Sequence, residues 1–153
     1  MNDVEKAWVA GLLEGEGSFM WRKSNSAKVS CQMTDIDVIF RLHKLIGGKV
    51  YKTTKSQQHH KDAWVCVVSG ISAVELMEDI GPLMGLRRGQ RILEVLETYY
   101  KHEIELTKKH GETRQNALMA ADEYLGTNRS LRDVAKDFGI SHVTLKNVLD
   151  RFR

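Results

Sequence analysis

The sequence predicts an α+β fold, with the element order α-β-β-α-β-β-α through about residue 100 and a small three-helix unit after it. Three observations carry this prediction. Polar and apolar residues alternate over 27–34, which is the period of a strand with one wet side. The apolar residues of 36–46 recur with helical spacing. Near the C-terminus, Ser130 and Ser141 precede short apolar segments as helix caps do.

Each element is predicted from its own periodicity and its own turn residues. The expected elements of the first domain are, in order, a helix at 3–13, strands at 18–23 and 27–34, a helix at 36–46, strands at 49–55 and 63–69, a helix at 72–80 and a long helix from 87 to about 109. The expected helices of the C-terminal unit are 116–125, 131–138 and 143–152. We therefore expect a domain at 1–100, a helical linker at 101–112 and a second domain at 113–153.

The composition excludes several classes of protein. Of the 153 residues, 42% are hydrophobic and 28% charged, which is ordinary for a globular protein in water. No apolar run reaches the roughly 20 residues of a membrane span, and the N-terminus does not resemble a signal peptide. Cys31 and Cys66 are isolated, so we expect reduced thiols and an intracellular, cytoplasmic location, associated with the nucleoid in a prokaryote or phage.

Positive charge is concentrated in two parts of the chain. The formal net charge is only +3, but residues 20–61 contain nine Lys and Arg against two Asp. Residues 127–153 contain six against three, whereas 70–126 contain seven against ten acidic residues. Two basic regions separated by an acidic one favour binding to a polyanion such as a nucleic acid.

The most informative segment is Val9–Phe19, where Glu14 and Glu16 stand among three glycines at the end of the first predicted helix. Glycine inside a helix costs roughly 1 kcal/mol relative to alanine, which the close approach of a second helix can offset. Carboxylates at the negative end of a helix dipole are unfavourable unless a cation lies beside them. A divalent ion bound by a carboxylate and a backbone carbonyl would supply that cation. The small residues that would face a second helix are Ala7, Ala10, Gly11 and Gly15.

The nine residues 9–17, Val-Ala-Gly-Leu-Leu-Glu-Gly-Glu-Gly, resemble the LAGLIDADG signature of homing endonucleases. The resemblance implies an αββαββα domain with a saddle-shaped antiparallel sheet, in which two motif helices pack together. It also implies that Glu16 binds the catalytic metal, with the Gly15 carbonyl as a second ligand. Because the chain holds one copy of the motif, we expect an isologous homodimer.

The same resemblance implies a site-specific double-strand DNA endonuclease, encoded in an intron, an intein or a free-standing gene. Its cofactor would be Mg²⁺, with Mn²⁺ as a substitute and Ca²⁺ bound without cleavage, and its target a long pseudo-palindromic site. Arg87 and Asp35 match the family's basic and polar catalytic positions, although Asp35 also suits a helix cap. Glu14 is expected to have a structural role. Two alternatives stay open: a DNA-binding transcriptional regulator without catalysis, and an RNA-splicing maturase on the same fold.

Residues of two surfaces are candidates for DNA contacts. Counting in twos along the strands gives the polar face of the sheet, which can read a major groove: Arg22, Ser24, Lys28, Ser30, Gln32, Thr34, Lys49, Tyr51, Thr53 and Lys55, with Trp64 and Cys66 on the fourth strand. The C-terminal unit resembles a helix-turn-helix through its apolar positions and Gly139. Its third helix would then offer bases His142, Thr144, Lys146 and Asn147.

Overall fold

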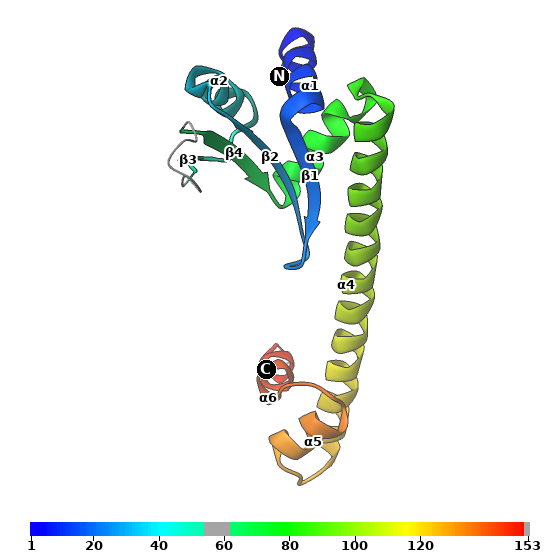
Figure 1. Cartoon of the computed structure of the whole chain (residues 1–153). Helices are drawn as coiled ribbons and strands as arrows, with labels where there is room; N and C mark the ends of the chain where they lie inside the picture. Colours follow the sequence, from blue (N-terminus) through cyan, green and yellow to red (C-terminus); the bar gives the residue numbers. More distant parts are fainter. Residues whose placement is uncertain (54–61, 152–153) are drawn as a thin grey trace. The chain divides into compact units, whose positions relative to one another are not determined.

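A computed structural model of the chain describes residues 1–53 and 62–151. Figure 1 shows the elements, which are α1 (Asp3–Glu16), β1 (Gly17–Arg22), β2 (Ser26–Met33), α2 (Ile36–Ile46), β3 (Lys49–Lys52), β4 (Trp64–Ser69), α3 (Ile71–Ile80), the 3₁₀ turn η1 (Gly81–Leu83), α4 (Leu86–Gly126), α5 (Leu131–Asp137) and α6 (His142–Leu149). The chain forms two compact units, Met1–His102 and Glu103–Arg153. The predicted α+β class and the order α-β-β-α-β-β-α are confirmed.

The first unit is built on a four-stranded antiparallel sheet with the strand order β1-β2-β4-β3. Its register separates two faces, because residues directly opposite each other in an antiparallel pair point to the same side. Phe19 lies opposite Val29, and Val29 opposite Val68, on the core face. Met20 lies opposite Lys28 on the other side, which we call the open face.

Helices cover only the core face of the sheet. The fully buried side chains of this unit come from α1, α2, α3, the beginning of α4 and the alternate residues of β1, β2 and β4. Asn2 is the N-cap residue of α1. Its side chain accepts a hydrogen bond from the backbone N–H of Glu5, and the Glu5 carboxylate accepts one from the backbone N–H of Asn2. This reciprocal cap fixes the start of the helix that carries the motif.

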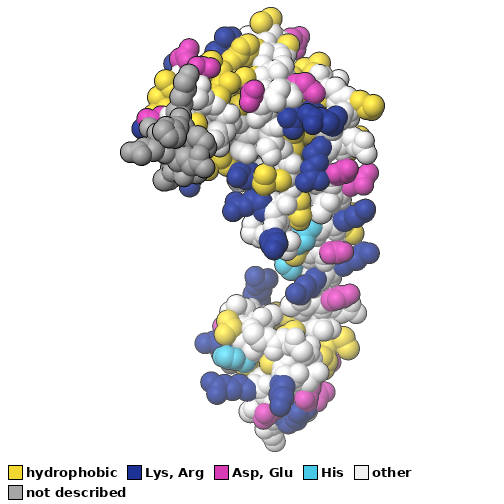
Figure 2. All heavy atoms as spheres, in the orientation of Figure 1, with side chains coloured by type: hydrophobic (Ala, Val, Ile, Leu, Met, Phe, Trp, Pro, Cys, Tyr) yellow, Lys and Arg dark blue, Asp and Glu magenta, His cyan; other side chains and the backbone are white. Residues whose placement is uncertain are grey.

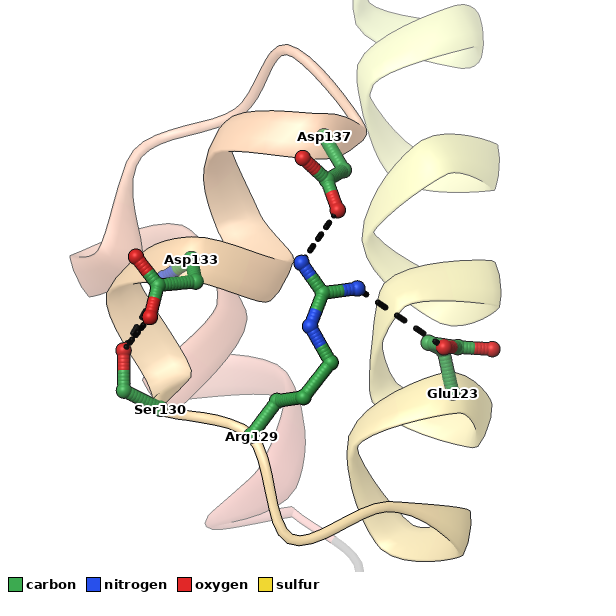
Figure 3. Close-up of polar contacts among 5 residues, drawn as sticks. All are labelled: Glu123, Arg129, Ser130, Asp133 and Asp137. Carbon is green, nitrogen blue, oxygen red and sulfur yellow. Dashed lines mark hydrogen bonds and ion pairs between the residues drawn. The ribbon is translucent and has the colours of Figure 1, made fainter.

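The second unit has a small core of its own. Its cluster of buried side chains consists of Ala120, Ala121, Val134, Ala135 and Leu145. Both short helices are capped as the sequence predicts, since Ser130 accepts from the N–H of Asp133 and Ser141 from the N–H of Thr144. Outside this core, Arg129 forms an ion pair of 2.6 Å with Asp137 and a longer one of 4.0 Å with Glu123 (Figure 3).

The structure differs from the expected elements in three places. The helices expected at 87–109 and 116–125 are one continuous helix, α4, because no residue of 110–115 is a proline and the one glycine, Gly111, is tolerated in an exposed helix. α1 continues to Glu16 and so includes both acidic residues. Asp35 occupies the N-cap position of α2, but its side chain makes no capping hydrogen bond.

Candidate functional site

The end of α1 places the two acidic residues of the motif in different surroundings. Glu16 is the last helical residue and is exposed, whereas Glu14 is half-buried. Gly17 begins β1 directly after Glu16, and a Cβ atom at this glycine would lie 2.3 Å from the Leu13 carbonyl oxygen. Only glycine therefore permits the chain to change from helix to strand at this point, which fixes the position of Glu16.

The cation expected at the end of α1 is present within the chain, and it is an arginine. The Nε atom of Arg88 donates to the Glu14 carbonyl at 3.1 Å, and its Nη2 atom donates to the Gly15 carbonyl at 3.3 Å. The guanidinium thus satisfies two carbonyls at the negative end of the helix dipole. We did not predict this residue, although the sequence signal was available: the helix end requires a cation, and Arg87 and Arg88 are adjacent candidates.

Glu14 forms a cap for another helix, as its expected structural role requires. Its Oε2 atom accepts a hydrogen bond of 3.0 Å from the backbone N–H of Gly85, the residue before α4. A carboxylate at the positive end of a helix dipole is favourable. The end of α1 is therefore bound to the beginning of α4 by Glu14 and Arg88.

Glu16 stays available for a ligand. Among the described residues its carboxylate accepts no hydrogen bond and forms no ion pair. Burial raises the pKa of the Cys31 thiol to about 11, and the negative charge of Glu16 adds to the rise. Cys31 in turn lies opposite Gly17 in the sheet.

Asp35 and Arg87 are the other two expected catalytic residues. Asp35 follows the end of β2 by two residues and is exposed. Arg87 is exposed in the first turn of α4, next to the Arg88 that contacts α1. Among the described residues, no hydrogen bond or ion pair joins Asp35 or Arg87 to Glu16, so their catalytic roles stay predictions.

The donor set at the end of α1 fits a hard divalent cation but is incomplete in one protomer. Carboxylate and carbonyl oxygens are the ligands that Mg²⁺ and Ca²⁺ prefer, and the Gly15 carbonyl keeps a second lone pair beside its bond to Arg88. Across residues 1–53 and 62–151, however, no cluster of three or more His, Cys, Asp or Glu side chains could hold a metal ion. A full coordination sphere would need water, a DNA phosphate or a second copy of the chain.

The open face of the sheet carries most of the predicted DNA-contacting residues. Lys28, Ser30 and Gln32 occupy alternate positions of β2 and so lie on the same face. Ser30 and Lys49 both lie opposite Val67. Tyr51 and Gln32 both lie opposite Val65. Arg22 ends β1 on the same face, opposite Ser26.

Three other candidates lie beyond the strands. Ser24 is in the turn between β1 and β2, and Thr34 follows β2; both are exposed. The Thr53 hydroxyl donates to the Ala63 carbonyl at 3.0 Å, which closes the β3–β4 hairpin. Lys55 lies outside the described residues.

The prediction for the fourth strand was wrong. Cys66 lies opposite Cys31 and is buried in the core, so Val65 and Val67 are on the open face instead. The apolar run Val65–Val68 has no polar alternation, so its sequence could not show which residues face the core. Trp64 lies opposite Met33 and packs against the core cluster.

The small residues expected to face a second helix separate into two groups. Ala7, Gly11 and Gly15 are exposed along α1, and a Cβ atom at Gly11 or Gly15 would have no neighbour within 4 Å. Ala10 is 4% exposed and belongs to the core of the protomer itself. The first group forms an uncovered strip of the motif helix.

The residues expected to read bases from α6 also lie in two places. His142 and Lys146 are exposed. The Thr144 hydroxyl lies 2.8 Å from that of Ser141, and Thr144 and Asn147 both line a groove between α6 and α4. Figure 2 shows Lys and Arg side chains on the visible face of both units.

No protein-family model matches the chain, and no curated protein does. Among solved structures it is similar to the homing endonuclease I-CvuI in complex with its target in the presence of Ca, with a TM-score of 0.52, 17% identity, and 90% of this chain and 96% of that chain covered. A second match is the archaeal intron-encoded homing endonuclease I-Vdi141I complexed with DNA, with a TM-score of 0.48, 14% identity, and 99% and 98% covered. No described helix is long and apolar enough to cross a membrane.

The similarity to I-CvuI shows that the chain has the fold of the LAGLIDADG homing endonucleases, the family that residues 9–17 resemble.

Proposed function

We propose that this protein is a homodimeric, Mg²⁺-dependent, site-specific DNA endonuclease. The observation that carries the proposal is the division of roles between the two acidic residues of the motif. Glu14 is bound as a helix cap, whereas Glu16 is exposed without a bonded partner among the described residues. An acid held at the negative end of a helix without a structural use is a typical metal ligand.

The uncovered strip on α1 supports the dimer. Gly11 costs helix stability, and a Cβ atom there would meet no described atom within 4 Å, so nothing described in the chain itself requires a glycine at this position. The motif helix of a second copy, related by a two-fold axis, would place the same small residues against this strip. It would also bring a second Glu16 to the site, which supplies the ligand that one protomer lacks.

The expected site residues have separate roles in this proposal. Glu16 and the Gly15 carbonyl would hold Mg²⁺, which when bound would supply charge neutralisation and activation of water for phosphodiester hydrolysis. Arg88 positions the carbonyls of Glu14 and Gly15. Arg87, the neighbour of Arg88, would neutralise charge on the scissile phosphate, and Asp35 would orient water.

The open face of the sheet would bind the DNA, since a β-ribbon with Arg, Lys and Gln side chains can read base edges in the major groove. We further propose that the second unit is a helix-turn-helix that lengthens the footprint, with His142 and Lys146 of α6 directed to bases.

Cleavage of a randomised duplex library tests this function. We expect staggered cuts at a specific sequence in Mg²⁺ or Mn²⁺, and binding without cuts in Ca²⁺. Glu16→Gln should abolish cleavage and retain DNA binding. Glu97→Gln makes the same change at another exposed carboxylate of the same unit, nine residues beyond Arg88 in α4, and should cleave as the wild type does. Specific duplex binding with no cleavage in any divalent metal would contradict the proposal and favour a regulator, and tighter binding to structured RNA would favour a maturase.

A further inference from the structure

The second unit contains a groove of about 330 Å³ between α4 and α6, which we call the α4–α6 groove. Its lining includes His110, Arg114 and Ala117 from α4, together with Asn147, Val148 and Arg151 from α6 and the residues after it. Ala117 is buried and Val148 half-buried, whereas the other four are exposed. The groove thus combines apolar contacts between the helices with polar and basic side chains that water can reach.

The two arginines of the groove lack acidic partners. Within the part of the chain that the structure describes, neither Arg114 nor Arg151 forms an ion pair. Arg129 of the same unit differs, since Asp137 and Glu123 hold it (Figure 3). The nearest acids in sequence, Glu112 and Asp150, do not line the groove. No carboxylate of the described residues therefore neutralises the positive charge of the groove.

Two arginines, an imidazole and an amide around one shallow groove suit a phosphate group. A guanidinium presents N–H donors in a planar fork that matches phosphate oxygens, and the amide of Asn147 adds a further donor. The Thr144 hydroxyl is already within hydrogen-bonding distance of Ser141. The groove is open to solvent along its length, as binding to a phosphate within a polymer requires.

We infer that the α4–α6 groove holds a backbone phosphate of duplex DNA between Arg114 and Arg151. The identity of the ligand rests on the proposed function. The inference also reassigns Asn147 from a base edge to a phosphate and leaves base contacts to the exposed His142 and Lys146. The groove then fixes the register of α6 on the duplex and carries no sequence information itself.

The salt dependence of DNA binding tests this site. The full-length protein is titrated against a fluorescein-labelled 40-base-pair duplex of mixed sequence in EDTA, and anisotropy gives the affinity at several salt concentrations. Each phosphate contact adds about 0.9 to the magnitude of the slope of log K against log salt. We expect Arg114→Gln with Arg151→Gln to lower this magnitude by about 1.8 for a dimer with two grooves.

Two further variants make the result specific. Arg132→Gln removes an exposed arginine of α5 outside the groove and should keep the wild-type slope. Arg114→Lys with Arg151→Lys keeps the charge and should retain most of the slope. A wild-type slope in the double glutamine variant, or an equal loss in the lysine variant, would overturn the inference.

The outcomes for the groove and for the enzyme are separable. Failure of cleavage with the expected change of slope would remove the endonuclease and leave the groove as a DNA contact. Normal cleavage with an unchanged slope would support the endonuclease and remove the groove as a DNA contact. A wild-type protein that binds no duplex would overturn both.

Discussion

Removal of the Arg88 side chain should destabilise the fold, and removal of the neighbouring Arg87 side chain should not. Arg88 is half-buried and donates to the carbonyls of Glu14 and Gly15, at 3.1 and 3.3 Å. Arg87 is exposed and makes no hydrogen bond or ion pair with another described residue. The two adjacent arginines are therefore matched in chemistry and differ in contacts.

The magnitude follows from what Arg88→Ala removes. A hydrogen bond to a charged group contributes about 1.5–3 kcal/mol when it is well formed, and partial exposure with a 3.3 Å distance reduces this to about 1 kcal/mol for each bond. Loss of a cation at a helix C-terminus adds roughly 0.3–1 kcal/mol. The free energy of unfolding should thus fall by about 2.5 kcal/mol, which lowers Tm by about 5–10 °C in a chain of this size.

Urea denaturation followed by circular dichroism measures this difference. Arg88→Ala should lower the urea midpoint with an unchanged m value. Arg88→Lys should recover only part of the lost stability, because an ammonium is a point charge that matches one carbonyl better than two. Arg87→Ala should keep the wild-type midpoint while it lowers the cleavage rate. Equal midpoints for Arg88→Ala and Arg87→Ala would refute the assignment of Arg88 as the cation of α1.

Three other predictions concern separate parts of the first unit. Gly11→Leu should convert the dimer to a monomer in analytical ultracentrifugation while it favours the helix by up to about 1 kcal/mol, and a stable dimer of this variant would exclude the strip on α1 as the interface. Gly48→Ala should lower the free energy of unfolding by at least about 2 kcal/mol, because Gly48 has φ of +88° and its Cβ would lie 2.3 Å from the Val67 carbonyl oxygen. Gly70→Ala should lower it by about 1 kcal/mol, because Gly70 has φ of +71° but an added Cβ would meet no atom within 4 Å. Equal losses of stability in the two variants would argue against the steric contribution at Gly48. Burial raises the pKa of Cys31 and of Cys66 from 9.0 to about 11, so the unfolded chain loses these protons first and stability should fall as pH rises from 9 to 11. Thermal melts over this range test the last prediction, and the double variant Cys31→Ala with Cys66→Ala should show a shallower decline.

The sequence was sufficient for elements whose periodicity is clean. The alternation of β2 and the helical spacing of α2 predicted their location within one residue, because each has one buried side and one exposed side. The strand Trp64–Ser69 shows the opposite case. Four apolar residues in succession hide the alternation, and only the register with Cys31 shows that Cys66 faces the core.

The site was predictable as far as single residues reveal their chemistry. The motif indicated two acidic residues and the need for a cation, but it could not show which partner each one has. Those partners, Gly85 and Arg88, lie more than 70 residues away in the chain. Local patterns carry no information about such long-range pairs, so the distinction between Glu14 and Glu16 required the structure.

The dependence of α1 on α4 has a consequence for synthesis of the protein. The motif is translated before α4, yet the contacts that hold its end come from Gly85, Arg88 and, through the Phe19 carbonyl, Arg91. Since these contacts close loops of more than 70 residues, they form only after α4 has left the ribosome. A nascent chain that ends before residue 85 carries Glu16 without this support. On the proposed function, nuclease competence would therefore arise late in translation, and products truncated there should be inert toward DNA.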